Sequence, residues 1–366
     1  MFNLIEKIKV DMWLLIPLLI ISSFGLMILY SASNESISII QAQSFKLIIG
    51  FGLMIAISQV HPNKIRVFSP RLYILTMFLL LCVFLFGEKI MGARRWLDLG
   101  IISLQPSEIM KLALPMMLAW LIFKKGMPKK LTTAVKFSAL IILPIFFVLN
   151  QPDLGTSILI IASGMFLLFQ AGLSYAFIAY SATIVIAALP LIWLLLKDYM
   201  RQRIITLFNP ELDPQGSGYH IIQSKIAIGN GGLSGKGYLE GTQSHLGFIP
   251  EQKTDFIFSV FSEEFGLLGI LFLLFLYSIL IFRMYHTIIS TSDMYEKLIT
   301  GSIMMIFASY IFVNIGMVSG ILPVVGVPLP LVSFGGTSIV VLLCSFGIIS
   351  SFSVHKRQDG ILIDLK

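Results

Sequence analysis

Charged residues and cysteines are both scarce in this sequence, and each shortage excludes a class of protein. Only 12% of the 366 residues are charged, whereas 57% are hydrophobic, and the mean hydropathy is +0.91. A soluble domain of this composition would expose apolar surface and aggregate, so we expect a protein dissolved in a bilayer. The two cysteines, Cys82 and Cys344, lie inside apolar runs, which leaves no pattern for a disulfide framework or a zinc site.

The net charge of +7 could indicate nucleic-acid binding, but the distribution of the charges argues against it. The basic residues cluster in short connections between apolar runs, as the positive-inside rule describes. A Walker A motif would need Gly at Asn230 and Ser or Thr at Gly237, and Ser234 occupies the last glycine position of G-x-G-x-x-G. We therefore expect no nucleic-acid partner and no nucleotide cofactor.

The apolar runs predict an all-α polytopic membrane protein with about ten transmembrane helices, each able to cross a ~30 Å hydrocarbon core. Small residues after the first run resemble a signal-peptide cleavage site, but the run is too long for one, so we expect a retained helix. The ten spans are expected near residues 13–31, 45–60, 70–87, 106–123, 133–149, 155–171, 174–196, 256–282, 298–319 and 329–353.

A single integral membrane domain is expected over residues 1–366. Residues 1–196 supply the first seven helices and residues 197–254 a long extracytoplasmic loop. Residues 255–366 supply the last three helices and a short cytoplasmic tail. Because basic residues fall on alternate connections and the number of spans is even, both termini are predicted to lie in the cytoplasm.

Polar residues concentrate in four places away from the predicted cytoplasmic connections: residues 91–111, 150–157, 197–254 and 314–338. The second is a tight turn in which an acidic residue suits the start of the next helix. In the third, clustered glycines could let backbone N–H groups approach an anion. The fourth has prolines and glycines in apolar sequence, which indicates either a broken helix beside a substrate cavity or a simple loop.

The first of these places contains two groups with alternative interpretations. Arg94, Arg95 and Trp96 could contact a substrate or simply anchor the chain at the membrane interface. Glu108 and Lys111 are i,i+3 neighbours that could pair within the membrane, either as a structural ion pair or as part of a site.

Three acids stand at the start of the apolar run in FIPEQKTDFIFSVFSEEFGLLG. On one continuous helix, Ser259 falls within about 40° of Asp255, whereas Glu263 and Glu264 point away. At 1.5 Å per residue, Glu263 lies ~12 Å deeper than Asp255. Asp255 is therefore the candidate that meets a polar substrate, and the two glutamates are expected to pair within the bundle.

Several longer motifs carry a resemblance to a known family. They are GYHIIQSKIAIGNGGLSGKGYLEGTQSHLGFIPEQKTDFIFSVFSEEFGLLG and GMVSGILPVVGVPLPLVSFGGTS, with RRWLDLG, LQPSE and QPDLGTS. Over nearly its whole length the chain resembles the SEDS family (shape, elongation, division and sporulation), and its RodA branch rather than its FtsW branch. One departure is Lys253, which stands where the family commonly has histidine before TDF.

The resemblance implies a peptidoglycan glycosyltransferase. Such an enzyme polymerises lipid II into glycan strands during cell elongation and rod-shape maintenance, on the outer face of the bacterial cytoplasmic membrane. The resemblance also implies a class B penicillin-binding protein as partner, together with other elongation-complex proteins. Asp255 matches the aspartate that the family is thought to need for catalysis.

This chemistry suits the candidate residues. Asp255 would act as general base on the attacking sugar hydroxyl. The departing diphosphate would need cationic side chains or a divalent metal, Mg or Mn. The predicted substrate-binding residues are Arg94, Arg95, Trp96, Glu108, Lys111, Lys236, Lys253, Ser259 and Ser333.

Two other functions are compatible with the sequence. A lipid II flippase would also use many spans, a broken helix and intramembrane acids, although transporter acids tend to lie near the midplane. A scaffold that only recruits the penicillin-binding protein would leave the polar outer residues unexplained. Glycan product formed from lipid II in detergent would separate a polymerase from both.

Overall fold

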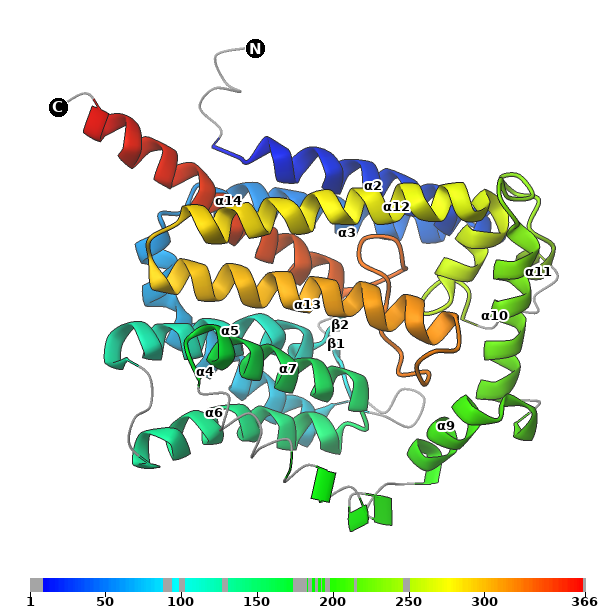
Figure 1. Ribbon diagram of the computed structural model, residues 1–366, viewed down its shortest axis with the longest axis horizontal. Helices are drawn as coiled ribbons and strands as arrows, with labels where there is room; N and C mark the ends of the chain where they lie inside the picture. The colour runs from blue at the N-terminus through cyan, green and yellow to red at the C-terminus, as the bar shows by residue number, and fades with distance from the viewer. Residues whose placement is uncertain are drawn as a thin grey trace.

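The computed structural model describes residues 9–87, 94–98, 103–126, 131–173, 198–213, 216–245 and 251–364, with isolated residues between 183 and 194. Within them the regular secondary structure is helical apart from one hairpin of two-residue strands, and the expected fold class is confirmed (Figure 1). The long helices are α2 (Met12–Ala32), α3 (Ile37–Ser58), α4 (Pro62–Phe86), α5 (Pro106–Lys125), α6 (Leu131–Asn150), α7 (Leu154–Gln170), α12 (Ile257–Ser290), α13 (Met294–Val318) and α14 (Thr337–Asp364).

These helices match nine of the ten predicted spans, and the span 174–196 lies largely outside the described residues. Seven of the described helices are long and apolar enough to cross a membrane, and 136–150 and 154–170 are shorter apolar helices. The predicted starts of α3 and α4 were too late, because polar residues at 37–44 and Pro62 at the first helical position both belong to helix. The predicted start of α14 was too early, since prolines and glycines keep residues 329–336 irregular.

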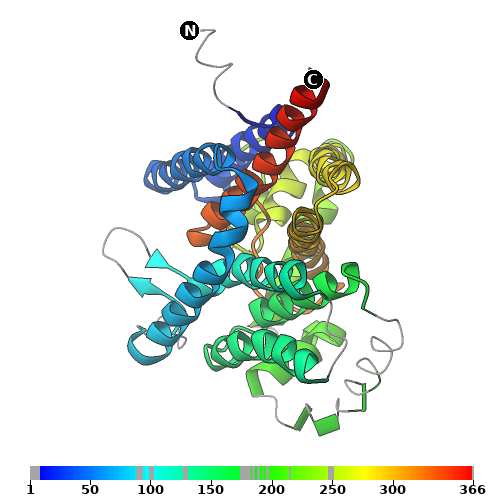
Figure 2. The same cartoon turned by 90° about the vertical axis from the view of Figure 1, so that its left-hand side faces the viewer.

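Smaller elements join the long helices. In the long connection these are α9 (Asp198–Phe208), the 3₁₀ helix η1 (Pro210–Leu212), α10 (Ser217–Gly231) and α11 (Thr242–His245). Before α5, strands β1 (Leu97–Asp98) and β2 (Ser103–Leu104) pair antiparallel, with Leu97 opposite Leu104. Seen along the bundle, this hairpin projects beyond the helices (Figure 2).

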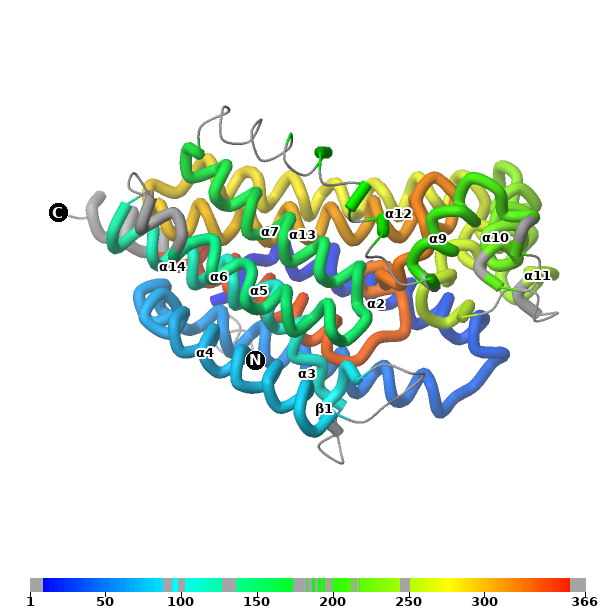
Figure 3. Tube along the Cα trace, turned by 90° about the horizontal axis from the view of Figure 1, so that it is seen from below, coloured from blue at the N-terminus to red at the C-terminus, as the bar shows by residue number. Residues whose placement is uncertain are grey.

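The two ends of the bundle differ. α2 begins and α14 finishes at one end, which we call the terminal end (Figure 1). α9, α10 and α11 gather across the opposite end, which we call the loop end (Figures 1 and 3). α5 is the most enclosed of the candidate spans, with 72% of its apolar window buried, so polar groups on it face protein rather than lipid.

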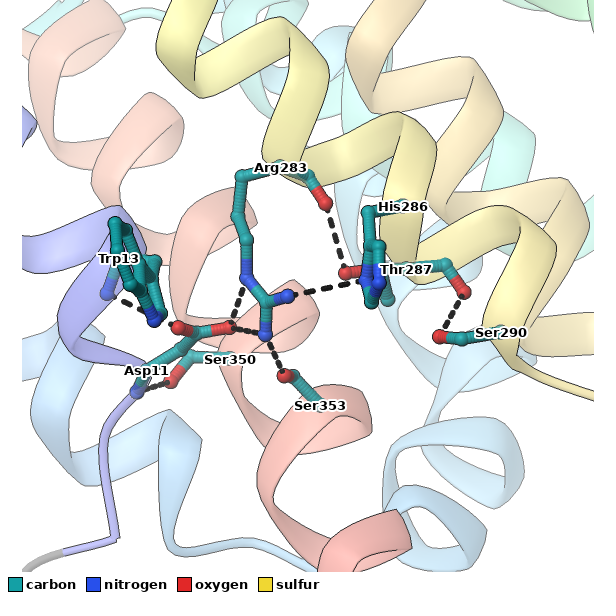
Figure 4. A network of polar contacts seen from close by, with 8 residues as sticks. All are labelled: Asp11, Trp13, Arg283, His286, Thr287, Ser290, Ser350 and Ser353. Carbon is teal, nitrogen blue, oxygen red and sulfur yellow. Dashed lines mark hydrogen bonds and ion pairs between the residues drawn. The ribbon is translucent and has the colours of Figure 1, made fainter.

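Side-chain ion pairs fasten the terminal end. The carboxylate of Asp11 accepts from Nε and Nη2 of Arg283 at 2.8 and 2.5 Å (Figure 4). The backbone N–H of Asp11 donates to Ser350 at 2.9 Å, and Arg283 Nη2 donates to Ser353 at 2.6 Å. Asp11 therefore ties the start of α2 to α12 through its carboxylate and to α14 through its backbone N–H, and a charge-assisted pair like Asp11–Arg283 is stronger than a neutral one.

At the loop end, α12 is not one regular helix. Gly266 has φ 61° and ψ −162°, which interrupts the helical hydrogen bonds two turns into the element. The loop 232–237 lies in the gap and supplies substitute partners. Four backbone hydrogen bonds of 3.0 to 3.1 Å join the segments: Lys236 N to Glu263 O, Gly237 N to Glu264 O, Leu267 N to Gly232 O and Leu268 N to Leu233 O.

This insertion explains the glycines of the long connection. A Cβ on Gly231 would lie 2.0 Å from the carbonyl oxygen of Ser262, and a Cβ on Gly235 would lie 2.0 Å from that of Glu264. Only glycine lets two backbones approach so closely. The N–H groups of Lys236 and Gly237 are used by the broken helix, and the anion cradle considered for this stretch is not needed to account for its composition.

A pair of glycine substitutions tests the insertion. Gly231→Ala is expected to lower the free energy of unfolding by about 1–3 kcal/mol, because its methyl group would overlap a backbone carbonyl. Gly229→Ala, two residues earlier in α10, meets nothing within 4 Å and is expected to leave stability unchanged or slightly raised. Thermal unfolding of both variants in detergent measures the difference. Equal midpoints would contradict the close contact.

Candidate functional site

Asp255 lies in the turn 251–256 that leads into α12, at the loop end of the bundle. The side chain is half-buried, and a Cβ built on Gly326 would lie 3.4 Å from its Oδ2. The irregular segment 319–336 between α13 and α14 therefore passes directly beside the carboxylate. Within the described part of the chain this carboxylate accepts no hydrogen bond, so it is available to a substrate.

The surroundings of Asp255 favour its protonated form more than water does. Burial, as the largest cause, and the negative charges of Glu251 and Asp153 raise the pKa of Asp255 to a net value of about 6. The guanidinium groups of Arg203 and Arg95 act in the opposite direction. A carboxyl group with a pKa near 6 can both accept and release a proton close to neutral pH.

The four polar regions expected from the sequence meet at this end of the molecule. Arg95 donates from Nε to Gln151 O at 3.2 Å and from Nη2 to Pro152 O at 2.6 Å, which joins the first region to the second. A Cβ on Gly155 would lie 2.8 Å from Val325 O, so the second region packs against the fourth.

Gln105 makes a further connection between these regions. Its side-chain Nε2 donates to Asp153 Oδ2 at 3.3 Å, and its backbone N–H donates to Thr337 Oγ1 at 2.9 Å. The other oxygen of Asp153 accepts from Thr156 N at 3.1 Å, so the predicted helix-capping role of this acid is confirmed.

The expected Glu108–Lys111 pair is present and is buried. Lys111 Nζ lies 2.6 Å from Glu108 Oε1, and 6% of Glu108 and 3% of Lys111 are exposed. Tyr310 of α13 completes a triad that sequence reasoning missed: its hydroxyl donates to Glu108 Oε2 at 2.9 Å and accepts from Lys111. The buried lysine charge is thus compensated within the bundle, as such charges must be.

A small cavity of about 40 Å³ separates this triad from the segment beside Asp255. Its lining includes Glu108, Lys111 and Tyr310 on one side and Leu329 and Ser333 on the other. The volume is enough for ordered water. Glu108 and Lys111 therefore line the same cavity as Ser333, whose hydroxyl donates to Thr254 O in the Asp255 turn.

The two glutamates of α12 are paired, but not with each other. Glu263 Oε1 lies 3.2 Å from Nζ of Lys236 and accepts from the backbone N–H of Thr242 at 3.0 Å. Glu264 accepts from the hydroxyl of Ser31 in α2. Glu263 is fully buried and paired, as expected, and its partners come from the long loop that lies against the break at Gly266.

The remaining predicted site residues have mixed surroundings. Arg94 is exposed, and Trp96 and Lys253 are partly buried. The buried hydroxyl of Ser259 donates to Phe256 O at 2.6 Å, within its own helix, and Ser333 is also buried. Substrate contacts by all of these residues, and by Lys236, stay predictions.

Metal ligation at this site also stays a prediction. Within the described residues, no three His, Cys, Asp or Glu side chains converge on one point. The described residues thus offer no protein-only ligand set of the kind that structural metal sites use, and we derive no step through a metal ion.

Comparison with known proteins agrees with this fold. A family model described as cell cycle protein (FtsW, RodA, SpoVE) matches residues 4–358. The peptidoglycan glycosyltransferase MrdB of Escherichia coli K12 is 46% identical over 354 residues, which are 96% of each chain. Stage V sporulation protein E of Bacillus subtilis is 33% identical over 372 residues, which cover 96% of this chain and 99% of that protein.

Solved structures share the whole fold. One, described as structural coordination of polymerization and crosslinking by a peptidoglycan synthase complex, contains a chain with TM-score 0.82 and 26% identity, covering 95% of this chain and 98% of that one. The rod shape determining protein RodA of Thermus thermophilus has TM-score 0.72 and 24% identity, covering 96% and 99%. With these matches along nearly its entire length, the chain belongs to the SEDS family of FtsW, RodA and SpoVE proteins.

Proposed function

We propose that this protein is a peptidoglycan glycosyltransferase that polymerises lipid II into glycan strands during cell elongation, with Asp255 as the general base. The observation that carries the proposal is the environment of the Asp255 carboxylate. Its carboxylate is half-buried at the loop end and its pKa is raised to about 6, and within the described residues no hydrogen bond occupies it. A relative 46% identical over 96% of the chain bears the name peptidoglycan glycosyltransferase.

The reaction needs one proton acceptor and a good leaving group. A sugar hydroxyl of the acceptor attacks the anomeric carbon of the donor, forming the new glycosidic bond. The bond from that carbon to the lipid diphosphate breaks, and the diphosphate leaves with the electron pair. Asp255 takes the hydroxyl proton, a contribution of about 10²–10⁴-fold for a positioned base.

The departing diphosphate requires positive charge near the carboxylate. Lys111 already pairs with Glu108 and donates to Tyr310, and Arg95 already donates to two backbone carbonyl oxygens. Exposed Arg94 and partly buried Lys253 form no ion pair among the described residues. We therefore assign to these two side chains the stabilisation of the departing diphosphate, and Lys253 lies two residues from the proposed base.

The proposed setting is the bacterial cytoplasmic membrane, with the loop end outside and both termini in the cytoplasm. Positive charge at the terminal end supports this orientation. The residues concerned are Lys9, Lys64, Arg66, Lys124, Lys125, Arg283 and Lys297. On the outer face, a class B penicillin-binding protein would crosslink the strands and complete a synthase complex of the kind found for the 26% identical neighbour.

Loss of the base is the direct test. Asp255→Asn, assayed with its transpeptidase partner on lipid II in detergent, is expected to lose about 10²–10⁴-fold in polymerisation rate while keeping its thermal stability. Asp198→Asn, which changes an exposed carboxylate in α9, is the matched control and should polymerise normally. If wild type forms no glycan in detergent and instead moves lipid II across vesicles, the flippase function replaces this one.

The pH dependence offers a second test. Since the proposed base acts only when ionised, kcat/KM should rise with pH through about 6 and then level off. Below this midpoint, kcat/KM is expected to fall about tenfold for each unit by which the pH is lowered. Initial rates between pH 4.5 and 8 give the profile. A rate that is constant down to pH 5 would exclude a base with this pKa.

A further inference from the structure

The turn that carries Asp255 is held through its backbone. Three successive carbonyl oxygens of this turn accept hydrogen bonds from elsewhere in the chain. The donors are Phe334 N to Lys253 O at 2.8 Å, Ser333 Oγ to Thr254 O at 2.6 Å and Asn314 Nδ2 to Asp255 O at 2.9 Å. We call these three bonds the carbonyl clamp.

Each side-chain donor of the clamp is itself fixed. Ser333 is 1% exposed, and its hydroxyl also accepts from Leu329 N at 2.8 Å. Asn314 is fully buried in α13, and its Nδ2 also donates to Val327 O at 2.7 Å. The two side chains therefore connect the turn to the same irregular segment that passes beside the carboxylate of Asp255.

A third side chain holds that segment from the opposite side. Gln43 of α3 is 2% exposed, donates from Nε2 to Ser333 O at 3.1 Å and accepts from Gly335 N at 3.3 Å. The position of the turn is thus determined by α3, α13 and the segment between α13 and α14. The side chains of Gln43, Asn314 and Ser333 are buried, and hydrogen bonds made by buried groups are strong and directional.

We propose that Asn314 and Ser333 are positioning residues, which hold the Asp255 turn so that its carboxylate faces the substrate. This inference rests on the proposed function. The clamp uses main-chain oxygens only, so it fixes the turn while leaving the carboxylate unoccupied. Substrate would meet a base that is already placed, and a displacement of about 1 Å at such a group costs about 10²-fold in rate. Ser333 thereby acts through Asp255 rather than through a substrate contact.

Substitutions of Ser333 distinguish a positioning role from a role in the stability of the fold. Ser333→Ala removes the donor to Thr254 O and is expected to lower kcat for lipid II polymerisation at least tenfold, with KM changed less than threefold. Ser333→Thr keeps the hydroxyl, and the cavity beside Ser333 has room for the added methyl group, so kcat should recover to within threefold of wild type. Ser163→Ala removes a buried hydroxyl that bonds only within α7 and should match wild type.

Asn314→Leu is the second variant, since leucine has the same number and branching of side-chain heavy atoms as asparagine but donates no hydrogen bond. This variant should also lose at least tenfold in kcat, and it tests the inference independently if Ser333→Ala does not fold. In both variants the midpoint of the kcat/KM profile is expected to move to lower pH, because a loosened turn exposes the carboxylate to water. The charged groups around it are Glu251 on the same turn, Arg95 before β1, Asp153 at the start of α7 and Arg203 on α9.

The outcomes separate this inference from the proposed function. If Asp255→Asn is inactive while Ser333→Ala and Asn314→Leu keep wild-type kcat, the clamp is not a positioning device. A rise in KM alone would make Ser333 a substrate contact and would also overturn the inference. If Asp255→Asn polymerises normally, Asp255 is not the base, and the inference that rests on it falls with that assignment.

Discussion

A backbone N–H or C=O group that leaves a helix inside a packed membrane protein is costly unless another partner replaces the lost one. This chain interrupts regular helix at Gly266 and again over residues 319–336. Distant segments supply the missing partners in both places: the loop 232–237 at the first, and Asn314 with the Asp255 turn at the second. The two repairs bring the turn, the long loop and the end of α13 together, and the candidate site is the result.

The three acids near the start of α12 illustrate what these repairs accomplish. Glu263 receives a lysine and backbone donors from the long loop, and Glu264 receives a hydroxyl from α2. Both carboxylates thereby hold elements together. Asp255 differs because only its main-chain oxygen is engaged, by Asn314. The carboxylate group thus has two roles in this segment. It is structural where the side chain makes the contacts, and it is available for chemistry where only the backbone does.

Much of this architecture was predictable, and the failures have a common cause. Hydropathy placed the spans because the cost of charge in a bilayer is local to each segment. The i,i+3 spacing likewise gave the Glu108–Lys111 pair. The break at Gly266 was missed because its substitute partners come from residues about 30 positions earlier in the chain. Tyr310 and Gln43 were missed for the same reason, since an isolated polar residue in an apolar span does not identify its partner.

The two ends of the bundle are fastened by different chemistry, and the difference suits the proposed function. At the terminal end, side-chain ion pairs such as Asp11–Arg283 join the helices, so charged groups there are consumed by structure. At the loop end, the clamp and the inserted loop rely on main-chain groups. Among the described residues at that end, Arg94, Lys253 and the carboxylate of Asp255 form no ion pair, and in the proposed function they meet a substrate that carries a diphosphate and a reactive hydroxyl. A site built this way can be rigid without neutralising the carboxylate on which its chemistry depends.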